Sequence, residues 1–262
     1  MATTFGPSSC NFGPHATSKQ DVGHLCKASS FISATVYYPT SDELPLLPSI
    51  VIVGGWGCGE QALAAWAPFY ASHGIVAMTI GTPAPWKDAP AARCQALLDA
   101  SKALQSEHDR EGSALQGRLD VSKRAVQGFS LGGGGAQLAA LRDHTLTCVI
   151  AMCPDGGTLM PCLSKEHTLD FPSERKGSVP VLIICGEKDS DAEIDKNAWP
   201  HYRQTPDTTS KLIFEVTGGD HFVANGPAGG RAGHDNDMVA INALIGCACM
   251  FMCPTSMWCG GP

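Results

Sequence analysis

The chain has 262 residues, of which 44% are hydrophobic and 16% charged, and its 25 acidic and 18 basic side chains give a formal net charge of −7. This is the composition of a globular protein, because a disordered chain has fewer apolar residues and a higher charge density. No lysine or arginine cluster indicates a nucleic-acid partner, and no apolar run approaches the roughly 20 residues that cross a bilayer.

The first 30 residues are rich in glycine, serine, proline and histidine and have no regular apolar pattern. We expect this segment, 1–30, to form an arm over the core of a single domain that comprises residues 1–262. The segment 1–14 has neither the basic start nor the apolar centre of a secretory signal.

Strand and helix patterns alternate after this arm. In the first half of the chain we predict strands at 31–38, 49–55 and 75–80, and helices at 60–72 and 91–107. In the second half we predict strands at 124–129, 147–152, 179–185 and 211–216, and helices at 131–142 and 237–249. A polar insert, 156–178, separates two of these strands. Alternating units of this kind predict an α/β fold with a mostly parallel central sheet and helices on both faces.

The pattern Gly-x-Ser-x-Gly occurs at Gly128, Ser130 and Gly132, directly between a predicted strand and a predicted helix. In this context the pattern indicates a nucleophile elbow, a sharp turn that raises the serine hydroxyl above the sheet. Three more glycines follow, although each costs a helix roughly 1 kcal/mol relative to alanine. Close packing of the helix against neighbouring backbone would explain them.

A serine hydrolase of this type has its acid and then its histidine after the nucleophile. Asp189 follows the next strand that ends in acidic residues, and we predict it as the triad acid. Glu187 is the competing acid, and Asp191 is a weaker candidate. His221 lies in a glycine-rich loop after the last predicted strand, and we predict it as the general base, with His234 as its nearest rival.

The oxyanion of the reaction needs two backbone N–H donors. The residue after the nucleophile, Leu131, supplies one. The other is expected from the glycine-rich loop 54–59, where Trp56 is the candidate and its indole would form a wall beside the acyl group. Cys58 in the same loop is not on an elbow, which disfavours it as an alternative nucleophile.

Twelve cysteines are many for a cytosolic enzyme, and their even number permits full pairing. Disulfides would imply an oxidising compartment, so we expect secretion, although Cys148, Cys153 and Cys185 in apolar runs could equally be small buried side chains. Cys10 and Cys26 could pin the arm. The cysteine-rich tail, 247–262, lacks the paired spacing of zinc knuckles, which leaves disulfides or free thiols there and no expected metal.

Taken together, these motifs resemble those of the bacterial cutinase and polyester hydrolase family, which includes polyethylene terephthalate hydrolases. This family belongs to the α/β-hydrolase superfamily, as do the dienelactone hydrolases. The likeness covers roughly residues 30–250 and includes the segments 36–39, 55–57, 71–74, 128–135, 181–189 and 220–222. It implies an α/β-hydrolase fold, a shallow cleft without a lid, no cofactor or metal, and a disulfide formed by two of Cys247, Cys249, Cys253 and Cys259.

Three positions depart from the family pattern. Trp56 stands where the family has tyrosine or phenylalanine, and Leu131 where it has methionine. Asp155 stands where the family has a tryptophan that grips the substrate. We therefore expect Asp155 at the substrate site, where it would remove a stacking face and disfavour activity on aromatic polyesters.

We expect a monomeric serine esterase that acts on small or polymeric hydrophobic esters through an acyl-enzyme. The alternatives are a hydrolase like the dienelactone hydrolases, chlorophyllases or platelet-activating-factor acetylhydrolases, or a hydrolase fold that binds without catalysis.

Overall fold

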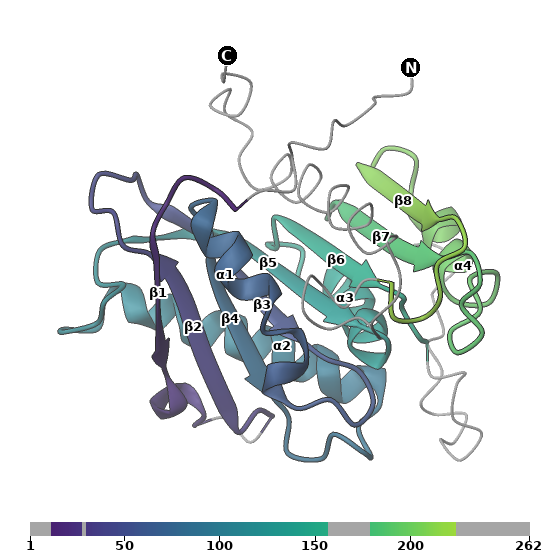
Figure 1. Ribbon diagram of the computed structural model, residues 1–262, viewed down its shortest axis with the longest axis horizontal. Coiled ribbons are helices and arrows are strands. Elements are labelled where there is room, and N and C mark those ends of the chain that lie inside the picture. The colour runs from purple at the N-terminus through teal and green to yellow at the C-terminus, as the bar shows by residue number, and fades with distance from the viewer. Residues whose placement is uncertain (1–11, 28–29, 157–178, 224–262) are drawn as a thin grey trace.

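The computed structural model describes residues 12–27, 30–156 and 179–223 (Figure 1). The predicted helix 237–249, the cysteine-rich tail, most of the insert 156–178 and the rival His234 lie outside these described residues.

Eight strands form one sheet in the order β1-β2-β4-β3-β5-β6-β7-β8. In chain order they are β1 (Thr17–Asp21), β2 (Ser33–Pro39), β3 (Leu47–Val53), β4 (Val76–Gly81), β5 (Leu119–Phe129), β6 (Cys148–Met152), β7 (Val181–Gly186) and β8 (Lys211–Val216). All pairs from β4 to β8 are parallel, whereas β1 and β2 are antiparallel additions at one edge. The predicted mostly parallel α/β sheet is therefore confirmed.

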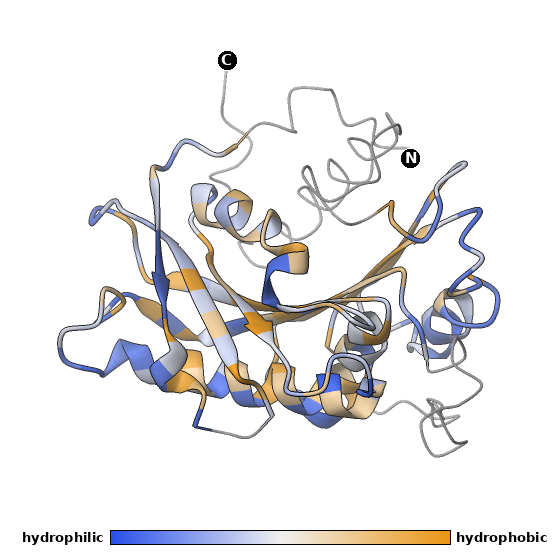
Figure 2. Cartoon of the chain, turned by 60° about the horizontal axis from the view of Figure 1, so that its bottom comes forward, coloured by the Kyte–Doolittle hydropathy of each residue, from blue (hydrophilic) through white to orange (hydrophobic). Residues whose placement is uncertain are grey.

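Helices cover both faces of this sheet, as Figure 1 shows. The α-helices are α1 (Trp66–Ser72), α2 (Pro90–Gln105), α3 (Leu131–Arg142) and α4 (Ala198–Gln204), and the short 3-10 helices are η2 (Gly23–Leu25), η3 (Glu60–Leu63) and η4 (Ser106–His108). Strand β3 contributes Val51 and Val53 to the core under α2 and α3, and Ile50 and Ile52 to the core under α1. Successive strand side chains point to opposite faces, so a strand between two helical layers is apolar throughout. In Figure 2 the central strands are accordingly mostly orange and the outer loops mostly blue.

Three parts of the structure differ from the sequence predictions. Strand β1 lies within the expected arm, but its sequence, TSKQD, is polar, and only its pairing with β2 makes it a strand. Helix α4 was missed because Pro200 is a helix breaker in the interior, although its missing N–H is tolerated here in the first turn. The predicted helix 60–72 divides into η3 and α1.

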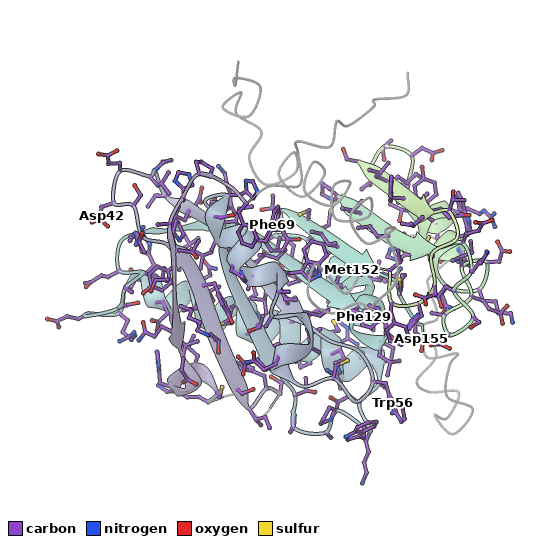
Figure 3. The ribbon with its side chains drawn as sticks, in the orientation of Figure 1. Asp42, Trp56, Phe69, Phe129, Met152 and Asp155 are labelled. Carbon is purple, nitrogen blue, oxygen red and sulfur yellow. The ribbon has the colours of Figure 1, made fainter. Side chains whose placement is uncertain are left out.

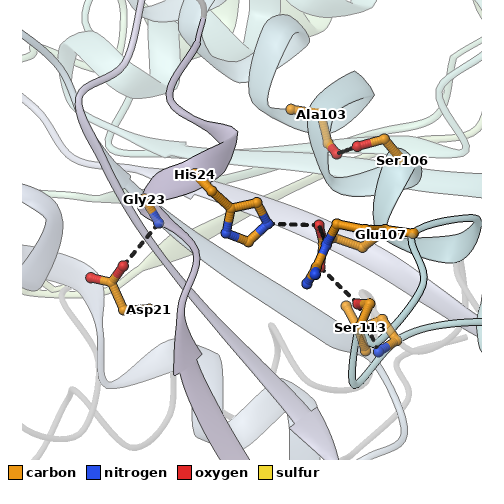
Figure 4. A network of polar contacts seen from close by, with 9 residues as sticks. Asp21, Gly23, His24, Ala103, Ser106, Glu107 and Ser113 are labelled. Carbon is orange, nitrogen blue, oxygen red and sulfur yellow. Dashed lines mark hydrogen bonds and ion pairs between the residues drawn. The ribbon is translucent and has the colours of Figure 1, made fainter.

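A buried carboxylate, that of Glu107, fastens the N-terminal segment to the end of α2 (Figure 4). It lies 2.9 Å from His24 Nε2 in η2 and accepts hydrogen bonds from Arg110 and Ser113. Burial alone would raise the pKa of Glu107, but the bonds from Arg110, His24 and Ser113 outweigh it and lower the pKa to about 2. We call these contacts between Glu107, His24, Arg110 and Ser113 the Glu107 tether. The tether depends on an ionised glutamate.

None of the helices in the described ranges combines the length and the apolar character that a membrane span requires.

Candidate active site

Ser130 occupies a strained turn between β5 and α3. Its φ of 56° and ψ of −121° are unusual for a residue with a side chain. The turn is tight, since a Cβ on Gly128 would lie 1.9 Å from the carbonyl oxygen of Gly132. Close backbone approach therefore requires glycine there, as in a nucleophile elbow.

The glycine run at the start of α3 lets three segments of the backbone approach the helix. A Cβ added at any of these positions would meet neighbouring backbone at 3.0 Å or less: Gly132, Gly133, Gly134 and Gly135. The predicted reason for the run, close packing around the elbow, is confirmed. The result is that α3 directs its N-terminus, with its partial positive charge, at the space beside Ser130.

The structure brings Ser130, His221 and Asp189 together from the ends of three strands. His221 Nε2 lies 3.0 Å from Ser130 Oγ, and His221 Nδ1 lies 2.8 Å from Asp189 Oδ2. A neutral imidazole that donates its Nδ1–H to Asp189 leaves Nε2 free to accept the serine proton. All three side chains are buried. This continuous hydrogen-bonded chain is the arrangement that activates a serine hydroxyl.

Asp189 is held by its own loop after β7. Its Oδ1 accepts the backbone N–H groups of Asp191, at 3.0 Å, and Ala192, at 2.8 Å. The competing acid, Glu187, is exposed and accepts the N–H of Gly218 at 2.7 Å. Asp189 is thus the acid in contact with the histidine, and Asp191 contributes only its backbone.

Aromatic rings support the histidine. The ring centroid of Phe129 lies 5.0 Å from that of His221, and the ring centroid of Phe222 lies 5.5 Å from it. Sequence reasoning did not assign Phe129 a part in the site, although its place directly before the nucleophile was a usable signal. The two rings restrict how the imidazole can rotate.

Trp56 lies in the loop after β3 and is 42% exposed. Its indole packs edge-on against Trp86, with centroids 4.8 Å apart, and its Nε1–H donates to the carbonyl of Trp86 at 3.0 Å. Trp86 is 62% exposed and was missed in the sequence, where a tryptophan between prolines in a loop is its only signal. The pair forms an exposed aromatic surface between the loop after β3 and the loop after β4.

The side chain of Asp155, which we expected at the substrate site, is buried. Asp155 lies after β6 on the same side of the molecule as Trp56 and Phe129 (Figure 3), but its side chain is fully buried. Its N–H donates to the carbonyl of Ser130 at 2.9 Å. A fully buried carboxylate cannot offer a face to a substrate, and the contact of Asp155 with the elbow is made by its backbone N–H.

Cys153 lies beside the triad, with its Sγ and ligand atoms of Asp189 and His221 all within 4.8 Å of one another. Burial, and then the charge of Asp189, raise the pKa of this thiol well above its usual value, which disfavours the thiolate that binds metals. Two ligands of a tetrahedral zinc ion are about 3.3 Å apart, since each bond is about 2.0 Å. The 2.8 Å between His221 Nδ1 and Asp189 Oδ2 fits a hydrogen bond better.

Six cysteines lie in the described residues, and all are free: Cys26, Cys58, Cys94, Cys148, Cys153 and Cys185. Burial raises the pKa of Cys94 to about 11 and those of Cys148 and Cys185 to about 12. Cys148, Cys153 and Cys185 were predicted to form disulfides or to be small buried side chains. The second interpretation is confirmed. The expected partner of Cys26, Cys10, lies outside the described residues, but Cys26 itself is a free thiol.

The sequence is similar to those of known hydrolases. Residues 7–234 match the model of a family described as "PETase: PET hydrolase-like". The chain is 32% identical to "Cutinase 1" of Thermobifida cellulosilytica over 82% of its own length and 74% of the relative's. It is 32% identical to "Cutinase" of Thermobifida fusca (strain YX), over 82% of its own length and 65% of the relative's. It is 30% identical to "Bis(hydroxyethyl) terephthalate hydrolase" of Streptomyces coelicolor, over 81% of its own length and 62% of the relative's.

Proposed function

The chain belongs to the PET hydrolase-like family and is a serine-type carboxylic ester hydrolase, and from this premise we propose that Ser130, His221 and Asp189 are its catalytic residues. The observation that carries the proposal is the hydrogen-bonded chain from Ser130 Oγ through His221 to Asp189. An esterase needs this arrangement, because a neutral serine hydroxyl is a poor nucleophile without a base that accepts its proton.

In the proposed mechanism, His221 Nε2 takes the proton of Ser130 as Oγ attacks the ester carbonyl carbon. The C=O π electrons move to oxygen, and this oxyanion is bound by the N–H groups of Trp56 and Leu131. When the oxyanion collapses, the ester C–O bond breaks and His221 returns the proton to the leaving alcohol. Water then attacks the acyl-enzyme by the same route, which releases the acid and restores Ser130. Asp189 orients the imidazole throughout and stabilises its positive charge.

The proposed substrates are hydrophobic esters, small or polymeric. The exposed indoles of Trp56 and Trp86 supply an apolar surface at the oxyanion loop, on which an acyl or aryl group can pack. The names of the relatives, cutinases and a bis(hydroxyethyl) terephthalate hydrolase, point to the same class. With Asp155 buried, the stacking surface that we propose for an aromatic acid is the Trp56–Trp86 pair.

We also propose that the protein acts as a monomer and is exported. The export proposal depends on the cysteines outside the described residues, because the six described ones are free thiols. Alkylation of the intact protein with and without prior reduction, followed by mass measurement, counts the disulfides and tests it.

The decisive experiment compares the hydrolysis of p-nitrophenyl butyrate by the wild type, Ser130→Ala and the exposed-serine control Ser122→Ala. We expect kcat to fall by about 10³-fold or more in Ser130→Ala, because removal of a triad member leaves only oxyanion and binding contributions. Ser122→Ala should match the wild type. Equal activity of Ser130→Ala and the wild type would refute the assignment of the nucleophile. Bis(hydroxyethyl) terephthalate and polyester film then define the substrate range.

A further inference from the structure

Arg93 is a fully buried arginine near the start of α2, and it reaches the loop that carries Trp56. Its Nη2 donates to the carbonyl of Gly55 at 3.0 Å and to the carbonyl of Pro85 at 3.2 Å. The exposed fraction of its side chain is 0%. A buried guanidinium is costly unless its charge is paired and its donors are used. The two carbonyls that accept from Arg93 therefore indicate what this buried charge is used for.

The contact with Gly55 bears directly on the oxyanion loop. The carbonyl of Gly55 and the N–H of Trp56 belong to one planar trans peptide unit and point in opposite directions. Arg93 and the N–H of Cys58, at 3.1 Å, both hold this carbonyl, so the N–H of Trp56 is held on the other side. No acceptor for the Trp56 N–H is found among the described residues.

This same peptide lies against the nucleophile. A Cβ on Gly55 would lie 2.6 Å from Ser130 Cβ and 3.2 Å from Ser130 Oγ. A small rotation of the Gly55–Trp56 peptide would therefore move the proposed oxyanion donor relative to the serine. Oxyanion stabilisation requires the donor within about 2.7–3.1 Å of the developing charge, so such a rotation reduces the rate.

Arg93 also links the loop that carries Trp86 to the loop that carries Trp56. The carbonyl of Pro85 accepts both Arg93 Nη2 and the N–H of Gly57, at 2.8 Å. Trp86 follows directly and accepts the Nε1–H of Trp56. One guanidinium thus holds the donor peptide and the base of the Trp56–Trp86 pair in one arrangement.

The charge of Arg93 is paired with that of Asp88. Its Nε lies 3.4 Å from Asp88 Oδ2, and that oxygen also accepts the hydroxyl of Thr82. Nη2 donates both hydrogen bonds to the carbonyls, while Nε lies within ion-pair distance of Asp88 without a hydrogen bond, so the planar guanidinium spans the carboxylate and the two carbonyls. A single ammonium group cannot occupy both positions.

We propose that Arg93, with Asp88 as its counterion, is a positioning residue for the oxyanion hole, which orients the Gly55–Trp56 peptide and couples it to the Trp86 loop. This inference rests on the proposed function of the Trp56 N–H as an oxyanion donor. It assigns a role in ester hydrolysis to a residue that does not touch the substrate.

The test is Arg93→Lys, assayed with p-nitrophenyl butyrate and with phenylboronic acid, which forms a tetrahedral adduct on the serine. We expect kcat to fall about 10- to 100-fold with KM changed less than about threefold, because the donor is displaced only in its orientation. The inhibition constant of phenylboronic acid should rise in parallel, since its tetrahedral adduct also places an oxygen in the hole.

The matched control is Arg124→Lys. Arg124 is also buried, bonds Ser101 and Asp143, and lies on β5 away from the elbow. We expect its kcat to stay within about twofold of the wild type even if its thermal midpoint falls. A loss of kcat that came only from general destabilisation would follow the thermal midpoint in both variants.

Wild-type kcat in Arg93→Lys would overturn the inference, and so would a loss of kcat without weaker boronate binding. Should Arg93→Lys fail to fold, Asp88→Asn tests the same link and should lower kcat and boronate affinity together. Unchanged values in that variant would also overturn it. Ser130→Ala separates the two proposals. An active Ser130→Ala variant refutes the proposed function. An inactive Ser130→Ala variant together with a fully active Arg93→Lys variant refutes only the role of Arg93.

Discussion

Asp189 and Glu187 stand two positions apart in the loop after β7, yet their carboxylates have different partners. Asp189 is buried and contacts His221, whereas Glu187 is exposed and bonds Gly218. Residue type does not separate them, since either acid can serve in such a triad. What distinguishes the two acids is the direction of the side chain. The N–H groups of Asp191 and Ala192 set this direction for Asp189.

We therefore expect Asp189→Asn to lower kcat by about 10⁴-fold, because an amide at that position favours the wrong imidazole tautomer. Glu187→Gln should retain kcat within about twofold. Steady-state kinetics on p-nitrophenyl butyrate distinguish the two. A large loss in Glu187→Gln with an active Asp189→Asn would reverse the assignment.

The first turn of α3 shows how one element depends on its neighbours. Glycine lowers the intrinsic stability of a helix, and alanine at Gly134 would gain up to about 1 kcal/mol from propensity alone. However, a Cβ there would lie 2.1 Å from the carbonyl oxygen of Asp155. The backbone would have to move, since a backbone carbonyl cannot rotate away as a side chain does.

Gly134→Ala should accordingly destabilise the protein by about 1–3 kcal/mol, the usual cost of overpacking, in spite of its propensity gain. Gly59→Ala is the control, because an added Cβ there meets nothing within 4 Å. Urea unfolding of both variants measures the difference. A Gly134→Ala variant as stable as Gly59→Ala would show that the Asp155 backbone yields easily.

At the scale of the whole molecule, the Glu107 tether makes stability depend on pH. The pKa of Glu107 is about 2 in the folded protein, below its ordinary value of 4.5. The stabilisation is therefore complete above about pH 4.5 and is lost as the pH falls from there towards 2. Because Arg110 and His24 are partly exposed, we expect about 1–2 kcal/mol from it.

Glu107→Gln should remove this contribution, so that the variant is less stable than the wild type at pH 7 and the difference shrinks towards pH 2. Thermal unfolding from pH 7 to pH 2 measures it, with the exposed Glu111→Gln as the control. A difference that stays constant with pH would mean that ionisation of Glu107 is not its origin.

The sequence alone was sufficient for features that depend on local pattern and turn chemistry. The bounds predicted for α3 and β8 agree with the structure, and the elbow was recognised from glycines flanking Ser130 between a strand and a helix. The serine–acid–histidine order also narrowed the site to a few residues. The strand, helix and elbow signals each lie within a few neighbouring positions, where backbone sterics decide the outcome.

Tertiary structure decided what depends on partners distant in the chain. Strand β1 exists because β2 pairs with it, and the choice of Asp189 over Glu187 depends on a histidine 32 residues away. Asp155 is buried, its backbone lies against Gly134 of α3, and Arg93 reaches a carbonyl 38 residues before it. Burial, direction and long-range hydrogen bonding are properties of the packed chain, and for that reason no local pattern encodes them.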